Sequence, residues 1–172
     1  GNLEVITCSQ WSKIAFINSG FPDERVKVIP LGVESSCFYP IESNKRKNLR
    51  QKLGFNNDDF ILLNVGALTP NKGIDLILKA YCDLKISYPN IKLIIKDSSK
   101  LYNINLAEIV KRLMENNRQN LDFNLLSDVV NISENLDIQG MNYLYNIVDA
   151  YISPYLAEGF NLPPLEAAAC GV

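Results

Sequence analysis

Two apolar runs of strand length, separated by a segment with helical periodicity, constrain the fold of this chain most strongly. Phe60–Val65 is bounded by turn signals, as expected for a central parallel strand covered on both faces. Ile91–Lys96 is the next such run. The apolar positions between them follow the i, i+3, i+4, i+7 spacing of an amphipathic helix, at Ile74, Ile77, Leu78, Tyr81 and Leu84. The pattern predicts a β-α-β unit with parallel strands and a right-handed crossover.

The alternation of helix and strand continues toward the end of the chain. The further predicted elements are a helix with apolar residues from Leu106 to Met114, a loop over Asn116–Asn124, a strand at Val129–Ile132, a helix face from Met141 to Val148 and a strand at Tyr151–Ser153. This order predicts an α/β fold: a Rossmann-like, doubly wound parallel sheet with helices on both faces. Ligands bind such sheets at the carboxyl ends of the strands, so Gly66–Gly73 and Pro154–Leu162 are the candidate binding loops.

The first fifty-odd residues are organised differently. Leu3–Thr7 and Val26–Pro30 are predicted strands on either side of a helix. The residues near Pro40–Lys47 are polar and charged and have no apolar pattern, which favours a linker or domain boundary. Asn44–Leu53 is predicted to be a short basic helix. We interpret its lysines and arginines as a solvated face rather than a phosphate site.

Two carboxylates, Glu158 and Glu166, lie eight positions apart near the end of the sequence. Asp149–Pro154 predicts a short buried strand that leads into the first of them. Pro163 and Pro164 suit the first turn of a helix, which places Glu158 on a loop and Glu166 near a helix start. A strand, a glycine-containing loop and a helix N-terminus together present backbone N–H groups to an anion. Ionised carboxylates beside such a site suit sugar hydroxyls, which donate hydrogen bonds to them.

The string EGFNLPPLEAAACG resembles the E-x7-E signature of retaining, nucleotide-sugar-dependent glycosyltransferases of family 4, which have the two-domain GT-B fold. The resemblance implies that Glu158 is a catalytic residue that contacts hydroxyls of the donor sugar. It implies that Glu166 binds the ribose hydroxyls of the nucleotide. It also implies that backbone amides face the diphosphate and the sugar at Gly159, Phe160, Asn161 and Leu162.

The loop G-A-L-T-P-N-K-G, residues 66–73, resembles the first loop of the family's C-terminal domain, usually G-R-L-x-x-x-K-G. Gly66 and Lys72 stand at the family's donor-binding positions, and the resemblance implies that Lys72 contacts the donor diphosphate. A lysine is a suitable point-charge partner for phosphate. Ala67 stands where many relatives have arginine, so one cationic phosphate contact of those relatives is absent here.

The string VITCSQWSK…RVKVIPLGVESSCFYP resembles the end of a GT-B N-terminal domain and its connector. Residues 1–40 are therefore expected to belong there, and residues 41–172 to form a truncated nucleotide-sugar-binding domain. For the parent protein the resemblance implies transfer of a hexose from a nucleoside-diphosphate sugar to an acceptor hydroxyl with retention. The acceptor site and a histidine near the donor lie in the family's N-terminal domain. Residues 1–172 alone are thus expected to bind a nucleotide without transferring sugar.

The resemblance implies no cofactor beyond the donor substrate and no metal, because GT-B relatives offset the leaving diphosphate with helix dipoles and cationic side chains. The implied partners are a nucleotide sugar and an acceptor that is a glycan, a lipid or a small molecule. Peripheral membrane association through the rest of the N-terminal domain, and self-association, stay open. The alternative is a non-catalytic module that binds a nucleotide sugar or a partner chain. A GT-B-like epimerase is disfavoured by the E-x7-E string.

Composition excludes several other classes. The 172 residues carry a net charge of −2 with mixed signs, so nucleic acid is not an expected partner. There is no histidine, which removes Ser-His and Cys-His nucleophile pairs, and the four cysteines are dispersed. Neither G-x-G-x-x-G nor a P-loop follows any predicted strand. With no signal-peptide pattern and no apolar run near the ~20 residues of a membrane span, we expect a cytoplasmic protein, or one at the cytoplasmic membrane face.

Overall fold

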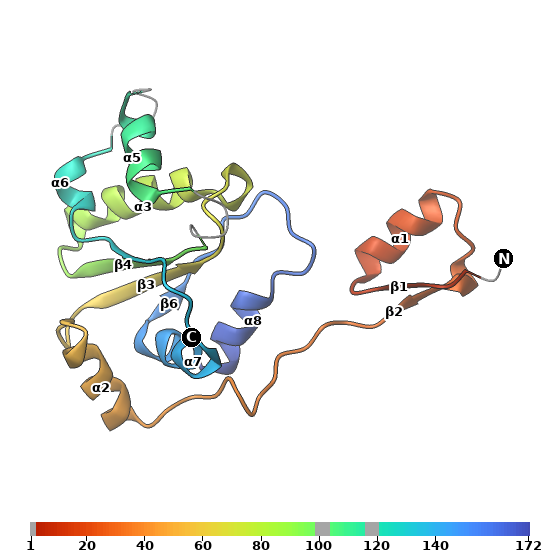
Figure 1. Cartoon of the computed structure of the whole chain (residues 1–172), viewed down its shortest axis with the longest axis horizontal. Coiled ribbons are helices and arrows are strands. Elements are labelled where there is room, and N and C mark those ends of the chain that lie inside the picture. Colours follow the sequence, from red (N-terminus) through yellow and green to blue (C-terminus); the bar gives the residue numbers. More distant parts are fainter. Residues whose placement is uncertain (1–2, 99–103, 116–120) are drawn as a thin grey trace.

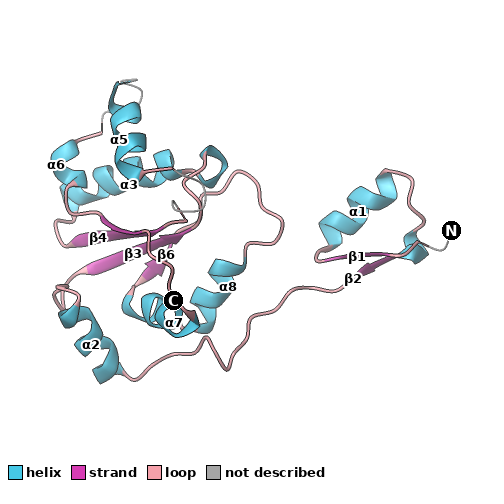
Figure 2. Ribbon diagram, viewed as in Figure 1, coloured by secondary structure: helices cyan, strands magenta, loops and turns pink. Residues whose placement is uncertain are grey.

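The computed structural model describes residues 3–98, 104–115 and 121–172, which form a small N-terminal unit and a larger unit joined by an extended connector (Figures 1 and 2). The small unit consists of β1 (Val5–Thr7), α1 (Gln10–Asn18) and β2 (Val26–Val28). The larger unit consists of α2 (Ser43–Lys52), β3 (Phe60–Val65), α3 (Ile74–Ser87), β4 (Ile91–Lys96), α5 (Leu106–Glu115), α6 (Phe123–Leu126), β5 (Val130–Ile132), α7 (Ile138–Ile147), β6 (Ala150–Tyr151) and α8 (Leu162–Ala169).

The main sheet is parallel throughout and has the strand order β5-β4-β3-β6. β3 and β4 pair along their whole length, from Phe60 opposite Ile91 to Val65 opposite Lys96. Both strands have the bounds that their apolar runs predict. The chain moves outward from β3 to β4 and β5, and then returns to place β6 on the other side of β3. The strand order therefore reverses between β3 and β6.

Alternate residues of the central strands enter two separate cores. Leu62, Leu93 and Ile95 pack in one core with apolar residues of α3, α5 and α6. Leu63 and Ile94 pack in the other, with residues of α7 and α8. The two sets of helices accordingly lie on opposite faces of the sheet (Figure 1). The predicted α/β fold with helices on both faces is confirmed.

Where the apolar pattern of the sequence is weaker, the predicted bounds of helices and strands are less accurate. α6 is a four-residue helix at the end of the stretch that predicts a loop, and Asp122 caps it by accepting from the backbone N–H of Asn124 at 2.8 Å. Residues 116–120 of that stretch lie outside the described part of the chain. β6 has only two residues, Ala150 and Tyr151, because only Leu62 and Leu63 of β3 stand opposite it.

The basic helix α2 does not present all of its charges to solvent. Arg50 is only 4% exposed, and its Nη1 lies 3.1 Å from each carboxylate oxygen of Asp149, the residue before β6. Arg46 Nη2 donates to Asp149 Oδ1 at 2.6 Å. Asp149 Oδ2 also accepts from the backbone N–H of Ile61 at 2.8 Å. The prediction of a solvated face is wrong for Arg46 and Arg50, because a carboxylate distant in sequence pairs with both.

The connector is fastened to the larger unit at residues 39–41. The backbone N–H of Tyr39 donates to Asn142 Oδ1 at 3.2 Å, and that of Ile41 donates to Asn146 Oδ1 at 2.8 Å. Asn146 Nδ2 in turn donates to the carbonyl of Tyr39 at 2.9 Å. Both asparagines are buried on α7. A buried amide that pairs with backbone on both its polar atoms holds a segment in one position.

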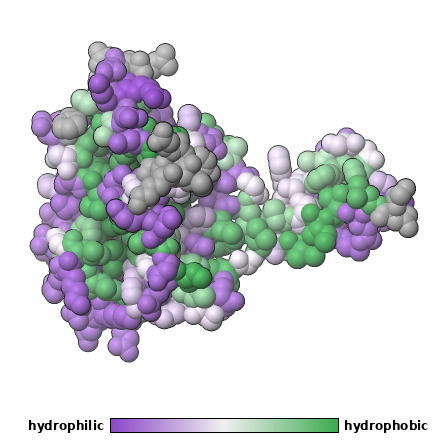
Figure 3. Space-filling view, viewed as in Figure 1, coloured by the Kyte–Doolittle hydropathy of each residue, from purple (hydrophilic) through white to green (hydrophobic). Residues whose placement is uncertain are grey.

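The N-terminal unit is a parallel β-α-β piece with apolar side chains on its surface. Ser9 caps α1 by accepting from the backbone N–H of Ser12 at 3.1 Å. Figure 3 shows apolar residues gathered on this unit and on the adjoining connector. Those more than 45% exposed are Leu3, Ile6, Trp11, Ile14, Ile29 and Leu31. Such a surface marks a packing or association site. That residues 1–40 end an N-terminal domain, and that the protein self-associates, stay predictions.

Replacing Asp149 with asparagine should lower the free energy of unfolding by about 2–3 kcal/mol, because Arg50 would lose its carboxylate partner while buried. Urea denaturation followed by circular dichroism measures the loss. The control is Asp83→Asn, which breaks the Lys79–Asp83 pair, whose side chains are 46% and 64% exposed. That control should cost below about 0.5 kcal/mol. Equal losses for the two variants would contradict a structural role for the Asp149 network.

Candidate functional site

Two loops, one after β3 and one after β6, meet at the carboxyl edge of the main sheet. The backbone N–H of Leu156 donates to the carbonyl of Asn71 at 2.8 Å, which joins the tips of the loops. At their base, Asn64 Nδ2 on β3 donates to the carbonyl of Ile152 at 2.8 Å. They leave the sheet where its strand order reverses, the position at which open α/β sheets bind ligands. The two loops predicted as binding loops are therefore neighbours in space.

The charged centre of these loops is an ion pair between Lys72 and Glu158. The two side chains are 21% and 26% exposed, and Lys72 Nζ also lies 4.1 Å from the ring centroid of Tyr155. Burial lowers the pKa of Lys72. An ammonium held between a carboxylate and an aromatic face has a fixed position. The sequence placed Lys72 and Glu158 at one edge of the sheet, and the structure brings them into direct contact.

Two glycines allow the loops to approach this closely. A Cβ atom added to Gly66 would lie 2.6 Å from the hydroxyl oxygen of Tyr155. A Cβ added to Gly73 would lie 2.6 Å from the carbonyl oxygen of Pro154, and Gly73 has a φ of 65°. At Gly73 any larger residue would meet the backbone of the β6 loop and push the two loops apart, whereas at Gly66 it would meet the end of the Tyr155 side chain. Gly159 is different, because the space around its Cα is open and its carbonyl accepts from Cys8 Sγ at 3.7 Å.

Helix α8 begins close to the predicted position but offers few N–H donors. Asn161, with a φ of 66°, immediately precedes its first residue, Leu162. Pro163 and Pro164 follow, so among the first three residues only Leu162 has a backbone N–H to donate. Asn161 Nδ2 donates to Ser153 Oγ at 2.8 Å and so ties the end of the loop to its beginning. The groups that this helix start offers to an anion are therefore the helix dipole and the backbone of residues 159–162.

Glu166 lies in the second turn of α8 and is held by a residue of α7. Its Oε2 accepts a hydrogen bond from the Tyr145 hydroxyl at 2.6 Å. Tyr145 is fully buried. The sequence places Tyr145 only on the apolar face of its helix. A buried tyrosine needs a hydrogen-bond partner for its hydroxyl, and this requirement is the signal that could have indicated a polar contact for Tyr145.

The carboxyl end of β4 contributes polar groups that sequence reasoning missed. Lys96 and Asp97 are both buried, and Lys96 Nζ donates to the carbonyl of Asp97 at 2.6 Å. Asp97 Oδ2 accepts from Ser133 Oγ, just after β5, at 3.2 Å. The available signal was a pair of charged residues at the end of a buried strand, Lys96 as its last residue and Asp97 directly after it. They join the ends of β4 and β5 at the same edge as the two binding loops.

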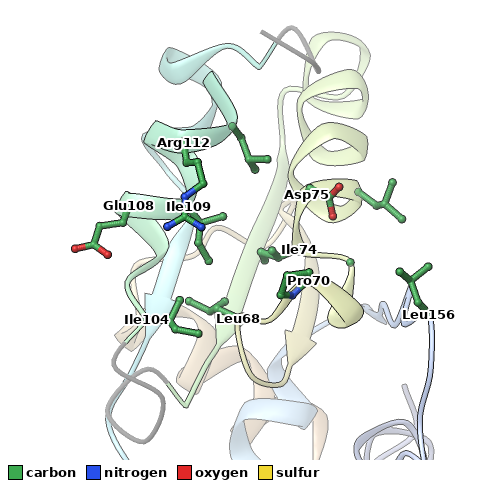
Figure 4. Close-up of a pocket in the computed structure, with 12 residues that line it drawn as sticks. Leu68, Pro70, Ile74, Asp75, Ile104, Glu108, Ile109, Arg112 and Leu156 are labelled. Carbon is green, nitrogen blue, oxygen red and sulfur yellow. The ribbon is translucent and has the colours of Figure 1, made fainter. Parts of the chain in front are cut away.

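A cavity of about 680 Å³ lies beside the loops rather than between the two glutamates. It is bounded by the start of α3, by α5 and by Leu156, with Leu68, Pro70 and Ile74 among the apolar residues of its wall (Figure 4). Lys72, Glu158 and Glu166 do not line it. We assign the candidate site to the charged loops, because sugars and phosphates need polar partners and this cavity is lined mostly by carbon.

The described residues contain neither a metal-binding group of side chains nor a membrane-spanning helix. Over residues 3–98, 104–115 and 121–172, no three Cys, Asp or Glu side chains are grouped so that they could hold a metal ion. In the same ranges, no helix has the length and apolar character needed to cross a membrane.

Comparison with known proteins gives consistent results. The sequence profile of the family described as glycosyl transferases group 1 matches residues 45–172. The chain is 30% identical over 170 residues to lipopolysaccharide 1,2-N-acetylglucosaminetransferase of Salmonella typhimurium, covering 98% of the chain and 42% of that protein. It is 28% identical over 155 residues to alpha-galactosylglucosyldiacylglycerol synthase of Streptococcus pneumoniae, covering 90% and 38%. Among solved structures, HepE of Anabaena in complex with UDP and glucose superposes with a TM-score of 0.75 at 25% identity, covering 98% and 42%.

The chain spans about two fifths of the length of these relatives. The superposition and the parallel sheet confirm the predicted GT-B fold, of which this chain forms part. Since the family profile covers most of the sequence, including both candidate binding loops, the chain belongs to the glycosyl transferases group 1 family.

Proposed function

We propose that this chain is mainly the donor-binding half of a glycosyltransferase that moves a hexose from a nucleoside-diphosphate sugar to an acceptor hydroxyl with retention of configuration. The observation that carries the proposal is the contact between Lys72 and Glu158, which brings a cation and a carboxylate together where the strand order reverses. HepE, which has the same fold, was solved with UDP and glucose, a nucleotide and a sugar of the proposed classes.

Each site residue has a role that suits its chemistry. Lys72 binds the diphosphate as a point charge, and Glu158 accepts hydrogen bonds from sugar hydroxyls. Glu166 accepts from the ribose diol. The backbone from Gly159 to Leu162 faces the diphosphate. No metal is required in this scheme, because Lys72 and the N-terminus of α8 offset the charge that develops on the leaving diphosphate.

A thermal-shift screen with UDP, GDP, ADP and their sugars tests the donor assignment, because a ligand bound only by the native state raises Tm. We expect one nucleotide series to stabilise residues 1–172. We expect sugar transfer only from a longer protein in which a complete GT-B N-terminal domain accompanies these residues, since catalysis between two domains needs both to position the substrates. Stabilisation without transfer by the longer protein would favour a non-catalytic binding module, the alternative that Ala67 at the family's arginine position supports. No stabilisation by any nucleotide would contradict donor binding.

Lys72→Ala should weaken binding of the nucleoside diphosphate by about tenfold or more, because a charge-assisted contact contributes about 1.5–3 kcal/mol. It should leave binding of the nucleoside unchanged. The loss should shrink at high salt, since salt screens the attraction between charges. Isothermal titration calorimetry at two salt concentrations measures both effects. Lys79→Ala is the control, because Lys79 is exposed on α3 and pairs with Asp83. A loss of the same size for both variants would remove Lys72 from the site.

Glu158→Gln should separate the roles of the two paired residues. A diphosphate that binds Lys72 must compete with the Glu158 carboxylate, so removing that charge should leave affinity for the bare diphosphate unchanged or raise it about two- to fivefold. Turnover by the longer protein should fall, because the sugar loses a charged acceptor. Diphosphate binding and initial transfer rates are the two measurements. Weaker diphosphate binding by this variant would place Glu158 on the nucleotide rather than on the sugar.

A further inference from the structure

The Tyr145 hydroxyl is held in one position against Glu166. Helices α7 and α8 pack side by side on one face of the sheet (Figure 1). The Tyr145 side chain is 0% exposed. Its ring packs edge-to-face against Phe38, with centroids 5.8 Å apart, and is tilted against Tyr151 at 6.3 Å. Packing on both sides fixes the ring, and the ring fixes the direction in which the hydroxyl donates.

The contact is a charge-assisted hydrogen bond of the strong kind. Its oxygen–oxygen distance of 2.6 Å falls in the range of O–H···O⁻ bonds. Burial and the neighbouring Glu166 carboxylate raise the pKa of Tyr145 well above its ordinary value, so the hydroxyl keeps its proton. Within the described residues, Tyr145 is the hydrogen-bond donor to the Glu166 carboxylate. A carboxylate has about four acceptor positions, so the remaining ones can accept from two hydroxyls.

We propose that Tyr145 is a positioning residue for ribose recognition. Its hydroxyl holds the Glu166 carboxylate in the orientation in which the other acceptor positions receive both hydroxyls of a ribose diol. A carboxylate oriented before binding loses less side-chain freedom when the ligand arrives. This inference rests on the proposed function, in which Glu166 binds the ribose. It adds a residue outside the E-x7-E string to the recognition of the nucleotide.

The chain contains a matched control for this inference. Tyr81 is also almost fully buried, and its hydroxyl donates to Asp128 Oδ1 at 2.9 Å. Asp128 precedes β5, and Tyr81 also approaches the carbonyl of Ile91 at the start of β4, so this pair lies at the amino edge of the sheet. Replacing either tyrosine with phenylalanine removes one hydroxyl–carboxylate bond made by a buried tyrosine. Only the Tyr145 pair lies beside the candidate site.

The experiment compares ligands that differ only in the diol. UDP, GDP and ADP, and their 2′,3′-dideoxy counterparts, are titrated by calorimetry into the wild-type chain, Tyr145→Phe, Tyr81→Phe and Glu166→Gln. We expect Tyr145→Phe to weaken the best ribose ligand about fivefold and its dideoxy counterpart by less than about twofold. Glu166→Gln should weaken the ribose ligand about tenfold or more. Tyr81→Phe should change neither.

The outcomes separate this inference from the proposed function. If Glu166→Gln discriminates against ribose but Tyr145→Phe weakens both ligands equally, or neither, the positioning role is wrong and the ribose role of Glu166 stands. If Glu166→Gln affects both ligands equally, or neither, the ribose role of Glu166 is wrong, and the inference about Tyr145 is wrong with it.

A double substitution tests whether Tyr145→Phe acts through Glu166 or through a general loss of packing. In a Glu166→Ala background, Tyr145→Phe should cause no further loss of ribose affinity, because the side chain that the hydroxyl orients is already gone. Additive losses would show that Tyr145 acts independently of Glu166 and would overturn the inference. Thermal unfolding of each variant, set beside Tyr81→Phe, measures any effect on folding in the same series.

Discussion

The placement of β6 depends on the carboxylate of Asp149. β6 is two residues long, and two residue pairs alone would hold it weakly against β3. Asp149 adds bonds to Arg46 and Arg50 of α2 and to the backbone of Ile61 on β3. Asp149 therefore holds α2, β3 and β6 together. The loop that carries Glu158 begins directly after β6. The geometry of the candidate site therefore depends on the bonds that Asp149 makes at the start of that strand.

Both glutamates of the E-x7-E string are held by residues outside it. Lys72 pairs with Glu158 from the β3 loop, and Tyr145 donates to Glu166 from α7. The string itself places one carboxylate on a loop and the other on a helix. The surrounding fold then supplies the partner that orients each one. Such contacts orient the side chains before a ligand arrives, which lowers the entropy lost on binding. The Lys72–Glu158 pair also has a cost, because a diphosphate would compete with Glu158 for Lys72.

The sequence predicts the parts of this structure that local pattern determines. β3 and β4 have the bounds of their apolar runs, because most positions of a strand covered on both faces require apolar side chains. The two binding loops could be placed at one edge, since topology alone brings the carboxyl ends of parallel strands together. Contacts between distant residues could not be predicted. Arg50 and Asp149 are 99 positions apart, and nothing near either residue distinguishes a buried arginine from a solvated one.

The fastening of the connector has a consequence for motion between the two units. Residues 39–41 are fixed to α7, and Ile29 is fixed to β1 by its bond to the carbonyl of Thr7 at 2.8 Å. Residues 34–38 are closed into a turn by bonds to the carbonyl of Glu34, and proline limits rotation at Pro30. If one unit rotates relative to the other as a rigid body, the rotation therefore occurs about the backbone bonds near Gly32. The pivot lies outside both sheets, so a rotation of the N-terminal unit would leave the pairing of β3 and β6 intact, although it would break the contact between Cys8 Sγ and the carbonyl of Gly159.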